Sequence, residues 1–366
     1  MALPRLAGMA RGGGVVPRVT SRGLGSEVAP RTFSGIQPTG ALHLGNYLGA
    51  VRGWVGGLEA QEERQASIFC VVDMHAISLP QDPAVLRANV RLMTASLLAC
   101  GLQPARCVLF QQSMVPQHAE LCWVLATLAA VPRLAALTQY KEKAASLREV
   151  PLGLFIYPVL QAADILLYKA TRVPVGEDNL QNMQVARDLR QKFNRHFFAG
   201  KSFFPQPEPV VPAGTAARLR SLRTPAKKMS KSDADSRATI YLTDTPDQLA
   251  AKVRACVTDS TRELSYCPAA RPGVANLLVI LAELSGSQPE ELCARLVAEG
   301  TNKVQLKEMV TASLVEHLGP IREELERLVK DTEHLDTVLE DGRRAASEIA
   351  EHTMADVRRL VGFRRL

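Results

Sequence analysis

Long hydrophobic runs are missing from this sequence. No stretch reaches eighteen uninterrupted apolar residues, and the most apolar segment, 152–168, is interrupted by Gln161 and Asp164. A membrane-spanning helix needs about 20 mostly apolar residues, so we expect a soluble protein with no membrane partner. With 46% hydrophobic and 22% charged residues, a chain of 366 residues can bury a large core and a smaller one. We therefore expect two domains.

Paired cysteines and clustered histidines are also missing. The seven cysteines are odd in number and scattered, and no two are spaced as CxxC. Neither a disulfide framework nor a zinc ribbon is indicated, which fits a reducing compartment. His75, His118 and His196 each lack a second residue at metal-ligand spacing, so we expect no protein-bound metal.

Acidic residues are nearly absent from the first 32 residues. This segment contains five arginines and one glutamate, so it carries +4 of the formal net charge of +7. Such a composition is typical of a mitochondrial transit peptide, and we expect its removal before Phe33 and a location in the mitochondrial matrix. A disordered cytosolic extension is the alternative, because glycines at 12–14 interrupt the amphipathic helix. The remaining +3 does not by itself indicate nucleic-acid binding.

Strand and helix patterns alternate over the first half of the mature chain. We expect strands at 67–73, 106–111 and 172–175 between helices at 83–100, 118–130, 154–168 and 177–193. This alternation predicts an α/β fold with a doubly wound parallel sheet of the nucleotide-binding, Rossmann-like kind, whose ligands bind at the carboxyl ends of the strands.

The pattern changes at a proline-rich segment, 204–212, and the sequence after Arg237 is mostly helical. We therefore expect a leader at 1–32, a catalytic domain at 33–240 and a helical C-terminal domain at 241–366. Within the last, we expect one helix opened by Pro320 and another from Gly342 to Leu360.

A glycine-rich turn lies near the start of the mature chain, where residues 33–46 read FSGIQPTGALHLGN. Glycines allow close backbone approach, a helix N-terminus supplies unpaired N–H groups, and His43 and Asn46 add polar side chains. The pattern predicts a phosphate site. A tight strand-to-helix turn, with these residues acting as caps, is the alternative.

The common phosphate loops are absent, since there is neither GxxxxGK[ST] nor a GxGxxG after a strand. The second candidate is therefore KMSKS at 228–232, preceded by Lys227. Lys228 and Lys231 place two ammonium groups on one polar loop, which suits the charge that builds on a leaving pyrophosphate. A solvated basic loop is the alternative.

HLGN followed by KMSKS resembles the two signature motifs of the class I aminoacyl-tRNA synthetases, in the same order. The segments FSGIQPTG, VVDMHAI, LTQYKEK, YPVLQAADILLY and PVGED are similar to the tryptophan branch, and the resemblance covers the chain after the leader. It implies that the carboxylate of L-tryptophan attacks the α-phosphate of Mg-ATP, and that the adenylate is transferred to tRNA-Trp. Such chemistry rests on positioning and charge stabilisation and needs no protein nucleophile.

The resemblance also assigns roles to residues, with Mg2+ entering only with ATP. It implies catalytic roles for His43, Asn46, Lys228 and Lys231. It implies ATP contacts at Gln37, His43, Leu44, Gly45, Asn46, Gly176, Glu177, Asp178, Leu219, Lys228, Met229, Ser230, Lys231 and Ser232. It implies tryptophan contacts at Phe33, Gly35, His75, Gln112, Tyr157, Gln161, Asp164, Val173, Val175 and Asn179.

Tyr157, Gln161 and Asp164 fall at i, i+4 and i+7, so they form one polar stripe on an apolar helix. Either a ligand or neighbouring protein groups must satisfy them. The resemblance assigns Asp164 to the indole N–H, which would also reject phenylalanine because the charge would be left unpaired. Gln161 is more similar to the tyrosine branch, whereas Phe33 lacks the hydroxyl usual in that branch.

The chain departs from its family at three positions, 161, 179 and 182. After PVGED the family usually continues Gln-x-Gln-His, whereas residues 179–182 read Asn-Leu-Gln-Asn. Asn179 keeps an amide but is one methylene shorter, which puts its contact with tryptophan in doubt. Gln161 replaces a methionine usual in bacterial tryptophan enzymes.

The helical region resembles the family's anticodon-reading domain, although basic helix faces are usually solvated surface. A homodimer is implied, and the apolar stretch 121–137 is the candidate interface. Three rival functions stay open: a tyrosine–tRNA ligase, a small nucleotidyltransferase with an HxGH-type site, and an inactive relative that only binds RNA. The basic residues of the helical region are Lys303, Lys307, Arg343, Arg344, Arg358 and Arg359.

Overall fold

The computed structural model describes residues 30–59, 66–211, 219–231 and 233–363. Ser232 and nearly all of the expected leader lie outside these residues. Five parallel strands form one sheet in the order β3-β2-β1-β4-β5, which confirms the predicted doubly wound α/β fold. The strands are β1 (Arg31–Ile36), β2 (Ala66–Val71), β3 (Val108–Gln111), β4 (Arg172–Pro174) and β5 (Glu208–Val210).

Two strands, β1 and β5, were not among those expected from the sequence. β1 begins at Arg31, whose backbone N–H bonds the Thr171 hydroxyl at 3.1 Å, so the folded region starts before Phe33. β5 lies inside the proline-rich segment, which we had expected only to end the α/β pattern. Proline is tolerated there because β5 is an edge strand, and an edge residue can do without one ladder hydrogen bond.

The order of the strands creates a switch point between β1 and β4. The chain moves from β1 outward through β2 and β3, then crosses to the other side of β1 to form β4 and β5. In open parallel sheets, ligands bind at the carboxyl ends of the two strands that flank such a point. The turn after β1 carries the HLGN motif and the turn after β4 carries Gly176–Asp178.

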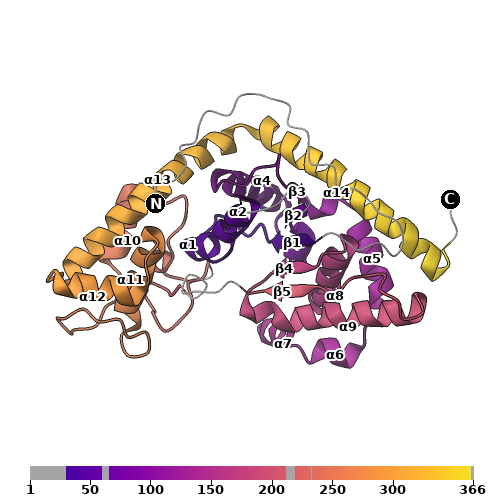
Figure 1. Cartoon of the computed structure of the whole chain (residues 1–366), viewed down its shortest axis with the longest axis horizontal. Helices are drawn as coiled ribbons and strands as arrows, with labels where there is room; N and C mark the ends of the chain where they lie inside the picture. The colour runs from indigo at the N-terminus through magenta and orange to yellow at the C-terminus, as the bar shows by residue number, and fades with distance from the viewer. Residues whose placement is uncertain (1–29, 60–65, 212–218, 232, 364–366) are drawn as a thin grey trace.

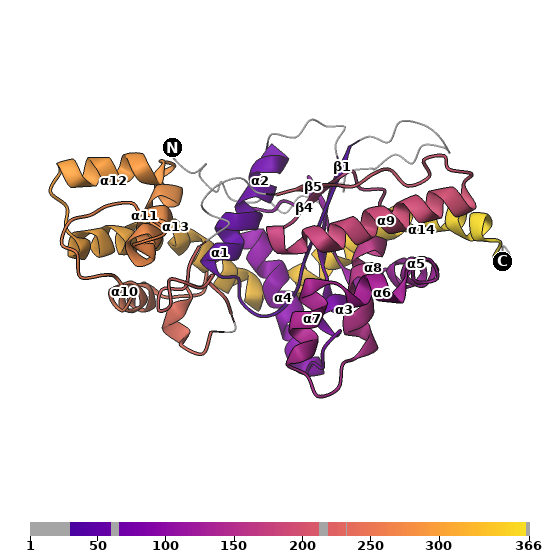
Figure 2. The same ribbon diagram turned by 90° about the horizontal axis from the view of Figure 1, so that it is seen from below.

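Helices cover both faces of the sheet (Figure 2). On one face, Phe69 and Leu109 pack with Trp54 and Met93, and on the other Ile68 and Phe110 pack with residues of a second set of helices. The first set is α1 (Leu44–Asn46), η1 (Tyr47–Val51), α2 (Arg52–Glu59) and α4 (Pro83–Ala99). The second is α5 (Gln117–Ala126), α6 (Val131–Ala135), α8 (Leu152–Leu167) and α9 (Leu180–Phe197). Short elements α3 (Asp73–Ala76), η2 (Gln112–Met114), α7 (Thr138–Ala145) and η3 (Glu177–Asn179) follow the strand ends or join these helices.

A long C-terminal helix, α14 (Thr332–Val361), closes the β3 edge of the sheet (Figure 1). A Cβ at Gly342 would lie 1.7 Å from the carbonyl oxygen of Leu109, so only glycine permits this approach. Covering the edge also removes a template for aggregation. The expected helical domain at 241–366 thus ends in a helix that packs on the sheet, and Gly342 lies inside that helix instead of opening it.

The remaining helices gather at the opposite end of the molecule (Figure 1). They are α10 (Pro246–Arg254), α11 (Pro272–Ser285), α12 (Pro289–Ala298) and α13 (Lys303–Lys330). The expectation that Pro320 opens a helix is wrong, because α13 continues through it. The lost backbone hydrogen bond is tolerated where Leu314, Leu318 and Leu325 anchor the helix by burial. Among the described helices, none is long and apolar enough to cross a membrane.

Candidate active site

The HLGN turn joins β1 to a continuous helical run over residues 44–59. His43 is the N-cap of α1, and its Nδ1 accepts a hydrogen bond from the backbone N–H of Asn46 at 3.2 Å. Leu44 N donates to Ile240 O at 2.8 Å, which fixes the turn against the segment after KMSKS. The capping role that we considered as an alternative is therefore present. It uses only one ring nitrogen and leaves the Nε2 face of His43 for a ligand.

The KMSKS loop reaches this same turn. Lys231 Nζ donates to Gly40 O at 3.1 Å and lies 3.4 Å from the Thr39 hydroxyl, although Lys231 and Gly40 are 191 residues apart in sequence. The loop is held by a hydrogen bond of 2.9 Å from Met229 N to Leu219 O, and both of those side chains are buried. The structure thus brings the two motifs together at the carboxyl end of β1.

The charges at this junction are arranged for an anion. Burial, and then the positive charges of Lys231 and Lys228, lower the pKa of His43 to about 4, so its imidazole is neutral at physiological pH. Burial also lowers the pKa of Lys231 to about 8. A phosphate placed here would offset both costs, because it supplies the missing negative charge. Asn46 Oδ1 is buried with no protein partner among the described residues.

Asp164, in the last turn of α8, is buried and accepts three hydrogen bonds, each of 2.7 Å. The donors are His75 Nε2, His118 Nδ1 and Gln112 Nε2. A carboxylate has no proton to offer, so both histidines must donate. Burial by itself would raise the pKa of Asp164, but His75 and His118 together hold it below its ordinary value.

The polar stripe on α8 could be satisfied by protein groups or by a ligand, and this network shows how far protein groups do so. Neighbouring protein groups do satisfy Asp164, as the core-network alternative predicted. Yet three bonds leave one of the four lone pairs of the carboxylate open. His75 Nδ1 and Gln112 Oε1 are also buried without a protein partner in the described part of the chain. The network therefore still offers polar atoms to a ligand.

His118 belongs to the hydrogen-bond network of Asp164, which the sequence did not reveal. We had treated it as an isolated histidine, but it lies between Asp164 and the hydroxyl of Tyr168, at 2.7 and 2.8 Å. It is 46 residues from Asp164 in sequence, and no local spacing signals such a contact.

Tyr157 connects the stripe to the first motif. Its hydroxyl accepts a hydrogen bond of 2.8 Å from Gln37, which lies directly after β1. Its ring centroid lies 4.1 Å from that of His75. The expected ATP and tryptophan regions are thus contiguous, as an in-line reaction between their ligands requires.

The other expected site residues differ in how far they are free to meet a ligand. Phe33 is 3% exposed and stacks on Tyr168, with ring centroids 5.5 Å apart, so one face of its ring is already covered. A Cβ at Gly35 would lie 2.8 Å from Cγ1 of Val72, so a larger residue there would require the Val72 side chain to shift. Leu44, Val173 and Leu219 are buried, Gly45 and Val175 are half-buried, and Gly176, Glu177, Asp178 and Ser230 are exposed.

The basic residues of the helical region do not form one face. Lys303 and Lys307, on α13, donate to the backbone carbonyls of Asp259 and Cys256. The four arginines lie on α14, beside the sheet, and each pairs with a nearby acid: Arg343 with Glu340, Arg344 with Asp341, Arg358 with Glu120, and Arg359 with Asp356.

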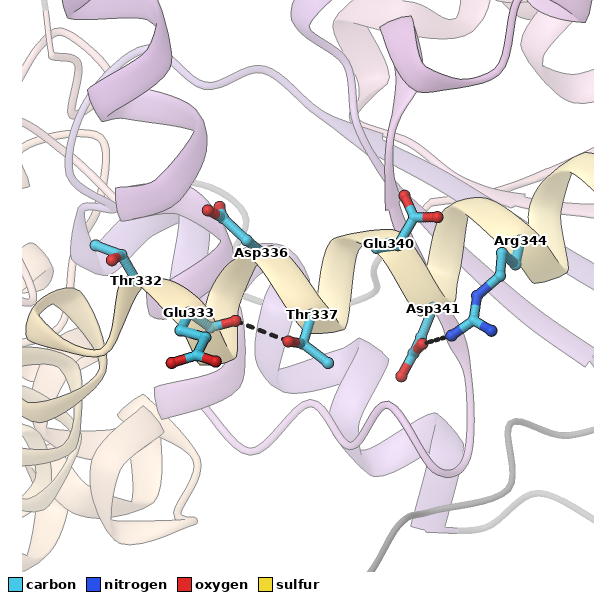
Figure 3. Close-up of a pocket in the computed structure, with 7 residues that line it drawn as sticks. All are labelled: Thr332, Glu333, Asp336, Thr337, Glu340, Asp341 and Arg344. Atoms are coloured by element: carbon cyan, nitrogen blue, oxygen red, sulfur yellow. Dashed lines mark hydrogen bonds and ion pairs between the residues drawn. The ribbon is translucent and has the colours of Figure 1, made fainter.

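A pocket of about 480 Å³ lies along one side of α14, and no residue of either motif lines it. Figure 3 shows the residues that do. The lining of the pocket suits neither a phosphate nor an indole, because it is mainly acidic, and three of its acids already pair with arginines: Asp336 with Arg91, Glu340 with Arg343 and Asp341 with Arg344. Within the described residues, no group of three or more His, Cys, Asp or Glu is placed to hold a metal. The pocket is lined by Thr332, Glu333, Asp336, Thr337, Glu340, Asp341 and Arg344.

Known proteins are similar to this chain over most of its length. The sequence model described as "tRNA synthetases class I (W and Y)" matches residues 26–319. The chain is 42% identical to a tryptophan–tRNA ligase of Nostoc sp. over 91% of its own length and 98% of the relative. It is 45% identical to one of Caulobacter vibrioides, over 91% and 96%.

Two solved structures of tryptophanyl-tRNA synthetases are also similar to this chain. The tryptophanyl-tRNA synthetase of Mycoplasma pneumoniae superposes with a TM-score of 0.81 at 30% identity, covering 92% of this chain and 99% of that one. The Campylobacter jejuni enzyme, complexed with ADP and tryptophan, superposes with a TM-score of 0.77 at 30% identity, covering 91% and 100%.

Proposed function

The chain belongs to the class I tRNA synthetases of the tryptophan and tyrosine group, and from that premise we propose that it activates L-tryptophan with ATP and transfers it to tRNA-Trp. One observation carries this proposal: Lys231 of KMSKS bonds the turn before HLGN at the carboxyl end of β1. The choice of tryptophan is supported by relatives that carry this activity in their names at 42% and 45% identity over nearly their whole length.

In the activation step, a carboxylate oxygen of tryptophan forms a bond to the α-phosphorus of ATP. The bond from that phosphorus to the bridging oxygen breaks, and pyrophosphate leaves with the electron pair. The nucleophile is already an anion, so no protein base is needed. Lys228 and Lys231 supply positive charge where the leaving group becomes negative. Neutral His43 donates a hydrogen bond there without adding a third charge.

The Asp164 network holds the other end of the substrate. The indole N–H donates to the lone pair that His75, His118 and Gln112 leave open on the carboxylate. Phenylalanine has no such donor and would leave a buried charge under-satisfied, so binding alone discriminates against it. Mg2+ enters this reaction as part of the nucleotide substrate.

We also propose which part of the chain contacts tRNA, how the chain dimerises and where in the cell it works. The helical unit of α10–α13 contacts the anticodon arm of tRNA-Trp. Trp123 and Val131, which are 71% and 65% exposed, mark a homodimer interface, while the other large apolar residues of 121–137 pack in the chain's own core. The arginine-rich leader directs the protein to the mitochondrial matrix. Because β1 begins at Arg31, a cleavage that spares the strand falls before it.

The decisive experiment is amino-acid-dependent exchange of pyrophosphate into ATP. The protein beginning at residue 30 is assayed with tryptophan, with tyrosine and with no amino acid. We expect exchange with tryptophan alone. Exchange with tyrosine would make this a tyrosine–tRNA ligase. Silence with both, together with retained tRNA binding, would favour an inactive RNA-binding relative.

A further inference from the structure

A connecting segment, residues 239–244, follows KMSKS and runs beside the HLGN turn. Leu44 N donates to Ile240 O at 2.8 Å. His43 and Tyr241 face each other as an antiparallel bridge. The backbone of the segment is therefore fixed against the residue that carries the imidazole of the first motif.

The same segment also bonds KMSKS. The hydroxyl of Thr239, which is 2% exposed, donates to the backbone carbonyl of Ser230 at 2.8 Å. Ser230 immediately precedes Lys231, whose Nζ donates to Gly40 O at 3.1 Å. Any shift of the connecting segment would therefore change where Lys231 lies relative to the HLGN turn.

Lys252, on α10, contacts the connecting segment and is only 9% exposed. Its Nζ donates to Thr239 O at 2.8 Å and to the two carboxylate oxygens of Asp244 at 2.7 and 2.6 Å. Asp244 is 6% exposed. A primary ammonium has three protons, so these protein oxygens use all of them. Lys252 therefore keeps no proton for a substrate, and its role must be indirect.

We propose that Lys252 and Asp244 are positioning residues, whose ion pair holds the connecting segment where it aligns Lys231 with the HLGN turn during activation. The inference rests on the proposed function. Lys252 bonds the first and last residues of the segment. In between, Asp244 Oδ2 accepts a hydrogen bond of 2.8 Å from Tyr241 N. The pair thus fixes the segment at three points.

The ion pair supplies direction that apolar packing would lack. Replacing a buried ion pair by apolar residues of similar volume is often neutral or even stabilising, whereas removing one partner alone is strongly destabilising. Stability therefore gives little reason to bury these two charges. Their hydrogen bonds do give one, because they fix the carbonyl of Thr239 and the N–H of Tyr241, which apolar side chains could not hold.

Helix α10 has other support for its own formation. It begins at Pro246, and Thr245 and Gln248 exchange hydrogen bonds in a capping box. Leu249 and Val253 are fully buried on its inner face. The ion pair is therefore not needed to start or anchor this helix, and its directed bonds act mainly on the connecting segment.

The test removes both charges together in the protein beginning at residue 30. Lys252→Met with Asp244→Leu leaves no unpaired charge in the core, so this double variant separates alignment from stability. Pyrophosphate exchange gives kcat and the KM of tryptophan. Calorimetric titration with tryptophan counts the folded sites, and the rate is expressed per site. Scanning calorimetry gives Tm.

We expect the double variant to lose about 10- to 100-fold in kcat per site, because a misplacement of about 1 Å can cost about 100-fold. The Kd and KM of tryptophan should change by less than about twofold, since the Asp164 network lies elsewhere. In a Lys231→Met background, the same double change should cost less than about threefold, because the group that it aligns is already gone.

Arg271→Met is the matched control. Arg271 also forms an ion pair in the helical unit, and within the described chain its hydrogen bonds go to Asp259 and the loop 261–265. We expect a lower Tm and an unchanged kcat per site. Should the double variant fail to fold, Thr239→Val keeps the ion pair and removes only the bond to Ser230 O. It should also lower kcat per site with tryptophan affinity unchanged.

An unchanged kcat per site in the double variant, or in Thr239→Val if that variant replaces it, would overturn the positioning role. So would an equal loss with and without Lys231, or an equal loss in Arg271→Met. In each of these cases, tryptophan-dependent exchange by the unsubstituted protein leaves the proposed function standing. If the unsubstituted protein shows no such exchange, both proposals are wrong.

Discussion

Replacing Lys231 by methionine should slow pyrophosphate exchange and also stabilise the folded protein, because it removes a positive charge that is partly buried. Lys231 is anchored to Gly40 O at 3.1 Å, in a turn that also holds His43. Deleting one preorganised group that stabilises transition-state charge typically costs about 10²–10³ in kcat, or about 3–4 kcal/mol. We expect that loss in pyrophosphate exchange, with the tryptophan KM unchanged within about twofold because Lys231 lies away from the Asp164 network.

The same substitution should stabilise the free protein below pH 8. Burial lowers the pKa of Lys231 to about 8, from an unfolded-state value of about 10.4. A base whose pKa is depressed by folding disfavours the folded state while it is charged. That penalty is fully present below pH 8 and disappears as the pH rises past the unfolded value. The Tm of Lys231→Met should therefore exceed that of the unsubstituted protein at pH 7, with the difference shrinking toward pH 10.

The rate loss is measured by pyrophosphate exchange. The change in Tm is measured by differential scanning calorimetry from pH 6 to 10. Lys227→Met is the matched control, since Lys227 is exposed and immediately precedes the motif. A parallel loss of tryptophan affinity and rate in Lys231→Met, or an equal rate loss in Lys227→Met, would refute a role confined to transition-state charge. A lower Tm at pH 7 would refute the burial argument.

Three further predictions concern other parts of the chain. Asp164→Ala should abolish the preference for tryptophan over phenylalanine in exchange assays and also lower the Tm, because His75 and His118 lose their buried acceptor; retained preference would place the indole N–H elsewhere. Gly342→Ala should destabilise the protein by about 1–3 kcal/mol in urea unfolding, since its Cβ would meet Leu109 O at 1.7 Å, while Gly319→Ala, whose Cβ meets nothing within 4 Å, should cost little. A chain beginning at residue 34 should have a lower Tm than one beginning at residue 30, because it lacks Arg31 and its bonds to Thr171 and Tyr168; equal melting would show that the end of β1 contributes nothing.

Local sequence patterns predicted much of the fold. The alternation of apolar strands with helices follows from the periods of the two structures, which are visible in any short window. It placed β2, α4 and α8 close to their observed bounds. The same approach failed at Pro320, because the burial of leucines on both sides of it, a tertiary effect, outweighs the proline's missing N–H.

The sequence by itself was enough to find the HLGN and KMSKS motifs, since each is a contiguous run of residues. It could not place Lys231 against Gly40, His118 between Asp164 and Tyr168, or Asn182 against Gln161 and Asn179. It also gave no sign that α14 returns to cover β3. Each of these contacts joins residues that are distant in the chain or on different elements, so it exists only once the order of the strands and the packing of the helices bring them together. Side-chain periodicity reports which face of an element is buried, and only the tertiary structure decides what that face meets.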